Sequence, residues 1–224
     1  MNTDLLAAAW QRRDAVNHRN DRPTQRRCST EPQSRAWVRS PATLSLRSGD
    51  DVPGLRFEGI ASVTERAYPM FDAFGEYQEV VDAAAFDATL RTDGLDVPLV
   101  LGHDQLRRIA RTTNGTLRLG VVDAGLRAEA DLDRDDVDVA YVAPKLLSGL
   151  LDEMSFAFRI VSGSWSPDFT EYRINEVDLH RGDVSIVGWG ANPHTTGTVV
   201  TKSINESLLA LADAAIGTHT SAIR

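Results

Sequence analysis

Short runs that alternate between apolar and polar residues, separated by turn signals, dominate the middle of the chain. Arg56–Val63, Thr116–Val121 and Leu126–Leu132 are of this kind. Alternation with period two turns one face of a strand to the core and the other to solvent. The turn signals recur about every eight to twelve residues, a spacing typical of sandwiches and barrels. With two helices predicted among these strands, we expect an α+β fold, a mainly antiparallel β barrel or sandwich with helices packed on it.

Charge divides the chain into a basic start and an acidic remainder. Residues 1–48 hold nine Arg, no Lys and four Asp or Glu, a formal +5; the whole chain carries −8, so the rest carries −8 − 5 = −13. Residues 1–36 are mostly polar and are predicted to be a disordered basic arm, in which 4–16 can form one short helix. Residues 37–200 are predicted to be the folded domain, and residues 201–224 a C-terminal helical tail.

The same composition narrows the expected partners. An acidic body argues against a specific nucleic-acid partner. No apolar run approaches the roughly 20 residues of a membrane helix, so no membrane contact is expected. The one cysteine, Cys28, excludes an internal disulfide and lies in a polar segment, where a nucleophilic role is not expected. The glycines fall in turns and form no phosphate-binding loop, so no cofactor is expected.

Local patterns predict the elements between residues 65 and 94. Glu65–Gly75 is predicted to be a loop and Glu79–Val81 a short strand. Asp82 is a suitable N-cap for a helix that ends near Gly94.

Further along, the dipeptide Asn114-Gly115 predicts a hairpin between Arg108–Thr112 and Thr116–Val121. Near the end of the domain, Glu171–Leu179 and Asp183–Val187 are predicted to be two strands with a turn between them.

Asp135 or Asp136 can cap a helix. The stretch Leu146–Ile160 is predicted to be the end of that helix, a break and then a strand. Side chains on one face of that strand are apolar, namely Met154, Phe156, Phe158 and Ile160. Ser155 falls on the opposite face, beside the small Ala157. A serine in this position is most often an ordinary sheet residue with its hydroxyl in water.

Two other residues give Ser155 a chemical context. His103 follows the buried strand Val97–Leu101 and is expected to continue the face of Leu99 and Leu101, and Asp183 opens another strand. Each alone has an ordinary explanation, but together they supply a nucleophile, a base and a carboxylate to orient that base. The order His–Ser–Asp and the absence of a Gly-x-Ser-x-Gly elbow exclude an α/β-hydrolase.

Several segments, taken together and in this order, resemble the prohead proteases of tailed phages. The resemblance covers about Arg56 to Pro193, and the segments that carry it are Glu79–Phe86, Pro98–Asp104, Met154–Phe158, Asp183–Val187 and Ala191–Pro193. It implies a fold similar to the herpesvirus assembly protease. It also implies a serine endopeptidase that cuts the scaffold, or the scaffolding segment of the major capsid protein, and commonly itself. The resemblance further implies that this cleavage takes place inside the procapsid, in the host cytoplasm.

By position, the resemblance makes Ser155 the nucleophile, His103 its base and Asp183 the third member, where the family commonly has glutamate. Herpesvirus enzymes use a second histidine as third member, so His180 and His194 stay open as alternatives. The same histidines show no metal-ligand spacing, and no metal is expected. Two rival functions also remain: a non-catalytic capsid assembly or scaffold protein of the same fold, and an esterase acting on small molecules.

Overall fold

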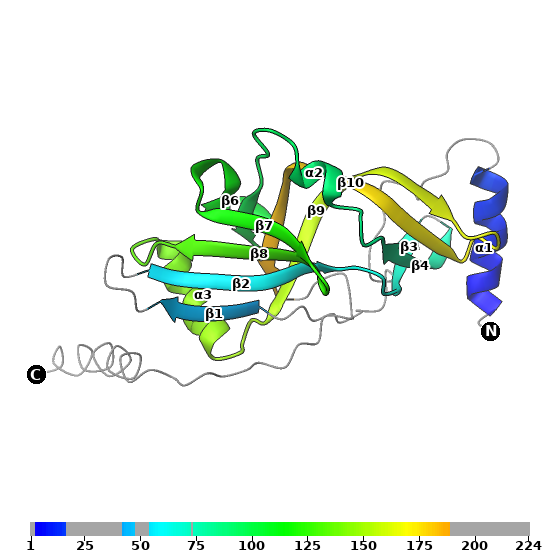
Figure 1. The fold of residues 1–224 in the computed structure, drawn as a ribbon. Coiled ribbons are helices and arrows are strands. Elements are labelled where there is room, and N and C mark those ends of the chain that lie inside the picture. The colour runs from blue at the N-terminus through cyan, green and yellow to red at the C-terminus, as the bar shows by residue number, and fades with distance from the viewer. Residues whose placement is uncertain (1–2, 17–41, 48–53, 73, 189–224) are drawn as a thin grey trace, which may run out of the picture.

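The computed structural model describes residues 3–16, 42–47, 54–72 and 74–188, and the fold is that of these residues (Figure 1). The predicted tail 201–224, and Cys28 and His194, lie outside them. In chain order the elements are α1 (Thr3–Val16), β1 (Ala42–Arg47), β2 (Gly54–Val63), β3 (Tyr68–Asp72), β4 (Gly75–Val81), α2 (Asp87–Leu90), β5 (Pro98–Leu101), β6 (Asp104–Arg111), the 3-10 turn η1 (Thr112–Asn114), β7 (Leu117–Val122), β8 (Gly125–Leu132), α3 (Val137–Leu147), β9 (Glu153–Trp165) and β10 (Glu171–Val187).

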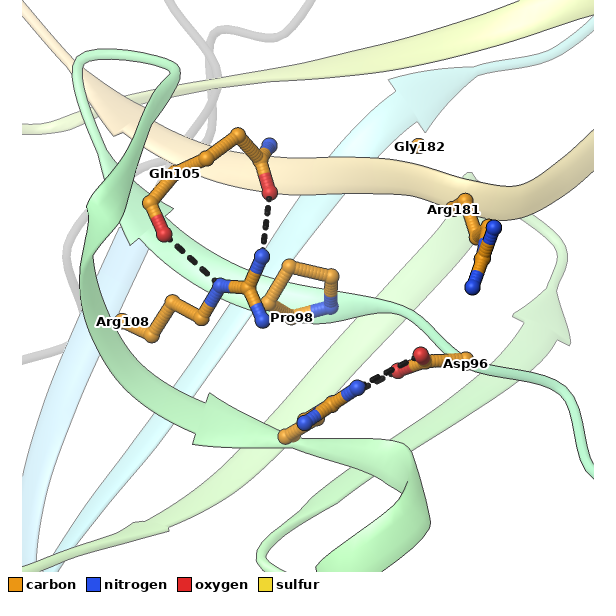
Figure 2. A pocket seen from close by; sticks show the side chains of 7 residues that line it. Asp96, Pro98, Gln105, Arg108, Arg181 and Gly182 are labelled. Carbon is orange, nitrogen blue, oxygen red and sulfur yellow. Dashed lines mark hydrogen bonds and ion pairs between the residues drawn. The ribbon is translucent and has the colours of Figure 1, made fainter.

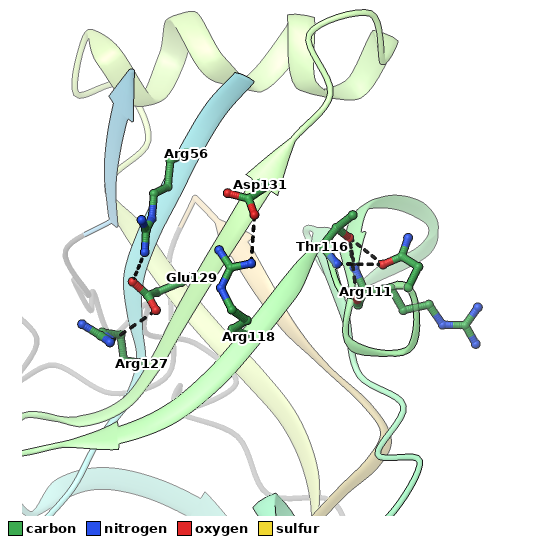
Figure 3. A network of polar contacts seen from close by, with 8 residues as sticks. Arg56, Arg111, Thr116, Arg118, Arg127, Glu129 and Asp131 are labelled. Carbon is green, nitrogen blue, oxygen red and sulfur yellow. Dashed lines mark hydrogen bonds and ion pairs between the residues drawn. The ribbon is translucent and has the colours of Figure 1, made fainter. Parts of the chain in front are cut away.

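A four-stranded antiparallel sheet has the order β1-β2-β8-β7. The predicted alternation is confirmed in β2 and β8, since Phe57 and Ala128 are fully buried. The opposite face carries ion pairs that cross from strand to strand, including Arg56 to Glu129 and Arg118 to Asp131 (Figure 3). This sheet therefore has one core face and one charged, solvated face.

The second sheet has the order β3-β4-β10-β5-β6, and β9 pairs with the other edge of β10. The two strands predicted within 171–187 are one long strand, β10. The register slips between Asp178 and Asp183, where Arg181 has a φ of 62°. Such a bulge absorbs the residues that look like a turn in the sequence. β10 runs parallel to β4 and β5 and antiparallel to β9, so this sheet is mixed.

The two sheets share one core, with Phe57 and Leu126 from the first and Leu99, Met154 and Ile186 from the second. They do not close into a barrel. The sandwich alternative of the predicted α+β fold is therefore the observed one. The predicted helix after Asp135 or Asp136 is confirmed as α3, with helix-capping hydrogen bonds from two amides to Asp136. No helix among the described residues is long and apolar enough to cross a membrane.

The loop predicted for 65–75 contains a strand, β3, which forms a hairpin with β4. Its side chains alternate, with Tyr68 and Met70 buried. The helix predicted from Asp82 is only the single turn α2. Val177 of β10 donates its amide hydrogen to the Ala85 carbonyl at 3.1 Å. The Ala85 carbonyl therefore accepts its hydrogen bond from the sheet and not from an amide of a longer helix.

The hairpin predicted at Asn114-Gly115 is wrong, because β6 and β7 belong to different sheets. Gly115 has the expected left-handed conformation, with a φ of 76°. The amide of Arg111, however, donates to the Thr116 side chain, and the Thr116 carbonyl accepts from Asp131 of β8. The bond from Asp131 joins the chain to the other sheet, so the turn is a corner of the sandwich.

The helix α1 docks on the far end of the β9–β10 hairpin, beside β4 (Figure 1). Arg12 is its anchor, with only 1% of its surface exposed. Its guanidinium donates two hydrogen bonds to Asp72, at 2.9 and 3.0 Å, and lies over the Tyr77 and Trp165 rings. The arm predicted for 1–36 therefore begins with a docked helix.

We expect Arg12→Ala to release α1, because it leaves the buried Asp72 carboxylate without its partner. Breaking a buried pair in this way costs about 3–5 kcal/mol. Amide hydrogen exchange over residues 3–16 measures the effect, and protection there should be lost. Arg13→Ala removes the same charge from an exposed neighbour and is the control. Unchanged protection in Arg12→Ala would contradict this role for the buried pair.

Candidate active site

His103 lies in the tight turn between β5 and β6. Leu101 and Asp104 pair across that turn, and both residues between them have positive φ, 61° for Gly102 and 59° for His103. Two positive φ values are the requirement of a type I′ hairpin turn, and histidine tolerates the left-handed region better than most residues. The expectation that His103 continues the face of Leu99 is wrong: Leu99 is fully buried, whereas the His103 side chain is 39% exposed.

The buried Ser185 of β10 holds the backbone of this turn. Its hydroxyl oxygen accepts a hydrogen bond from the His103 amide at 2.9 Å. The same hydroxyl lies 3.3 Å from the carbonyl oxygens of Val100 and Ile186, to which it can donate. Because a buried hydroxyl must be satisfied, these contacts tie the histidine turn to the centre of the sheet.

Asp183 lies two residues before Ser185 on β10 and is 2% exposed. Its Oδ1 is 2.7 Å from Nδ1 of His103, and its Oδ2 accepts a hydrogen bond from Gln105 at 2.7 Å. An ionised carboxylate only accepts, so Nδ1 carries the proton and Nε2 of a neutral imidazole is left as an acceptor. With both oxygens in contact, the carboxylate has one defined orientation toward His103.

Ser155 lies on β9, directly opposite Ser185 in the antiparallel ladder, and Ala157 lies opposite Asp183. Directly opposed residues project from the same face of a sheet, with Cβ atoms about 4.5–5.5 Å apart. Ser155 therefore shares a face with Asp183. The next residue, Phe156, turns the other way and packs on Phe86 and Phe158. The predicted division of this strand into an apolar face and a serine face is confirmed.

Within the described part of the chain, the Ser155 hydroxyl makes no hydrogen bond to His103. The serine is half-buried. Two residues further along β9, Ala157 packs closely against Gly182 of β10: a Cβ atom added to Gly182 would lie 2.0 Å from the Ala157 carbonyl oxygen. Nucleophile and base contacts are often long before a substrate binds.

The other candidates lie elsewhere or outside the description. His180 accepts a hydrogen bond from the Asp96 amide through Nδ1 at 3.3 Å, and in the described structure it forms no hydrogen bond with His103 or Asp183. His194 is beyond the described residues. Among residues with a described placement, no three histidine, cysteine or carboxylate side chains gather as metal ligands would.

Two residues that contact this site were not predicted, Gln105 and Ser185. Each follows a predicted site residue by two positions, Gln105 after His103 and Ser185 after Asp183. For Ser185, strand alternation is a usable signal, because residues i and i+2 share a face. For Gln105 there is no such signal, because the turn that separates β5 from β6 interrupts the alternation.

The structure joins an imidazole to a carboxylate and places a serine on the same sheet face as that carboxylate, and these are the residue types that nucleophilic acyl transfer needs. A family model described as caudovirus prohead serine protease matches residues 43–209, more than half of the chain. No curated protein and no solved structure matches the chain. A family of this description implies a serine protease of capsid maturation, acting on capsid protein within the procapsid in the host cell. The resemblance to tailed-phage prohead proteases is thereby confirmed, and the chain belongs to the caudovirus prohead serine protease family.

Proposed function

We propose that this chain is an active endopeptidase that cleaves the scaffold, or the scaffolding segment of the major capsid protein, with Ser155, His103 and Asp183 as its catalytic residues. The observation that carries the proposal is the 2.7 Å contact between Nδ1 of His103 and Oδ1 of Asp183, on the sheet face from which Ser155 projects. A non-catalytic assembly protein has no need of an imidazole held by a carboxylate on a sheet face that also carries a serine. The likeness to the herpesvirus assembly protease stays a prediction.

In the proposed reaction, Oγ of Ser155 attacks the scissile carbonyl carbon while Nε2 of His103 takes the hydroxyl proton. The imidazolium, stabilised by Asp183, gives that proton to the leaving amine as the C–N bond breaks, and an acyl ester forms on Ser155. Water, deprotonated by the same imidazole, then hydrolyses the ester. The serine and the neutral histidine are regenerated, and no cofactor is required.

We propose further that the enzyme cuts its own chain. A protease binds an extended segment, and exposed terminal segments supply one most readily. Cleavage within about the first 40 residues or after about residue 195 is expected, with the folded domain left whole.

A fluorophosphonate probe tests the enzyme assignment without knowledge of the substrate. The probe phosphonylates an activated serine, so wild type should be labelled at Ser155. His103→Ala and Ser155→Ala should not be labelled. A folded wild-type protein that resists the probe would favour the non-catalytic assembly protein. Co-expression with the capsid protein of the same phage separates protease from esterase, because only the protease shortens that protein.

The third member of the site is tested by His180→Ala. Because His180 is hydrogen-bonded to the Asp96 amide and not to His103, this variant should keep cleavage within about tenfold of wild type. Initial rates of capsid-protein cleavage measure it, with His103→Ala as the inactive comparison. An inactive, folded His180→Ala would indicate a Ser-His-His site. His194→Ala should likewise stay within about tenfold of wild type.

A further inference from the structure

An open pocket of about 320 Å³ adjoins the Asp183 side of the site, between β10, β5 and β6. Three arginines line it, Arg108, Arg111 and Arg181, together with a single carboxylate, Asp96 (Figure 2). The chain as a whole has a net charge of −8, so the charge of the residues that line this pocket is opposite in sign to that of the whole protein. A concave, positively charged surface on an acidic protein favours an anionic ligand.

One of the three arginines is already neutralised. Arg111 donates hydrogen bonds from two nitrogens to the two oxygens of Asp96, both at 2.6 Å. These bonds lower the pKa of Asp96 below its ordinary value, and the carboxylate stays ionised. The pair therefore cancels its own charge, and Arg108 and Arg181 leave the pocket with two positive charges.

Within the described part of the chain, neither of the other two guanidiniums that line the pocket is paired with a carboxylate. Arg108 donates to the backbone carbonyl of Gln105 at 2.7 Å and to its side-chain oxygen at 3.2 Å, both neutral acceptors (Figure 2). The exposed Arg181 side chain has no hydrogen bond or ion pair among the described residues. Its backbone is held in place, with its amide on the Asp96 carbonyl at 2.9 Å. The guanidinium of Arg108 is therefore held by Gln105, and the Arg181 side chain extends from a fixed backbone position at the pocket.

Gln105 joins this pocket to the proposed catalytic residues. Its amide nitrogen donates to Asp183 while its oxygen accepts from Arg108. The pocket also includes Gly182, the residue next to Asp183. A peptide cleaved at Ser155 and extending across β10 would therefore place a nearby side chain over the arginines.

We propose that this pocket is a specificity subsite that binds an aspartate or glutamate side chain of the substrate segment, near the scissile bond. Arg181 and Arg108 hold the carboxylate, for which the planar guanidinium fork is well suited. The proposal rests on the proposed protease activity. Arg181 is the residue to test, because Arg108 also supports Gln105 and its loss would disturb the proposed catalytic residues.

The test compares wild type with Arg181→Glu on a library of synthetic peptides, whose cut sites are identified by mass spectrometry. Wild type should enrich Asp or Glu at one fixed position relative to the cut. Arg181→Glu should lower cleavage of those peptides at least about tenfold, in line with losing a charge-assisted contact. It should cleave versions with Lys at that position faster than wild type does. On matched peptides with Gln at that position, the cleavage rates of Arg181→Glu and wild type should agree within about twofold.

Arg134→Glu makes the same charge change at an exposed position between β8 and α3 and should keep the acidic preference. Fluorophosphonate labelling of Ser155, run on all three proteins, separates this proposal from the protease assignment. Normal labelling with no acidic preference, or with a preference that survives in Arg181→Glu, overturns the subsite alone. Normal labelling without cleavage of any acidic peptide overturns it as well. Absent labelling in wild type overturns the protease assignment and the subsite with it.

A preference for polynucleotide over acidic peptide in a competition assay would assign the pocket to nucleic acid instead.

Discussion

Ser155→Ala is expected to abolish cleavage of the capsid precursor while the protein stays folded. The proposed reaction has no other nucleophile, and loss of the nucleophile in a well-studied serine protease costs about 10⁶-fold. The hydroxyl is half-buried and forms no hydrogen bond to His103 in the described structure, so its removal should change stability by less than about 1 kcal/mol. Gel analysis of capsid-protein cleavage in co-expressing cells measures the result.

The intact masses of the two purified proteins provide a second reading of the same variant. Wild type should lose a segment from one end or the other, and Ser155→Ala should retain its full mass. Ser162→Ala, an exposed serine on the same strand, is the matched control and should behave as wild type. Capsid maturation at a normal rate by folded Ser155→Ala would remove this serine from the mechanism.

Asp183→Asn is expected to lower the rate of cleavage at least about 10²-fold. The equivalent change in a known serine protease lowered turnover by about 10⁴-fold. Oδ1 of Asp183 lies 2.7 Å from Nδ1 of His103, and an amide nitrogen in that position donates where a carboxylate accepts. Nδ1 must then give up its proton and Nε2 must carry it, which is the wrong tautomer for accepting the serine proton. The imidazolium of the transition state also loses its counter-charge.

Asp104→Asn is the matched control for this change, since Asp104 is exposed and adjacent to His103. Its side chain accepts a hydrogen bond from the Leu106 amide, which an asparagine oxygen can also do. Rates of capsid-protein cleavage and thermal unfolding midpoints should be recorded for both variants. The midpoint of Asp183→Asn should stay close to wild type, because the asparagine keeps the shape of the side chain. An active Asp183→Asn together with an inactive His180→Ala would transfer the third role to the histidine.

Local sequence patterns were sufficient where one strand face is buried. The alternation in β2, β8 and β9 predicted which side chains enter the core, and it placed Ser155 on the face opposite Phe156. Period-two alternation is a property of the backbone itself, so it survives whatever the strand packs against. The cap of α3 was predicted at Asp135 or Asp136, because a cap acts on amides two and three residues away, and the structure places it at Asp136.

Patterns failed where distant segments competed for the same backbone groups. The Asn114-Gly115 turn is a corner between the two sheets because the amide of Asp131 in β8 donates its hydrogen bond to the Thr116 carbonyl. Ala85 does not continue a helix because its carbonyl accepts a hydrogen bond from the amide of Val177 in β10. Each partner lies far along the chain, and no local propensity reports which of two acceptable hydrogen bonds tertiary packing will favour.

By itself, the sequence determined the residue types of the proposed site, the strands that carry two of them and the family to which the chain belongs. Only the tertiary structure decided that β10 lies between β9 and β5, which places Ser155 on the strand beside Asp183 and His103 in the turn that follows β5. It also decided the left-handed turn at His103, held by Ser185, and the contact of Gln105 with Asp183. These depend on strand order and register, which are set by burial of the whole core rather than by any one segment.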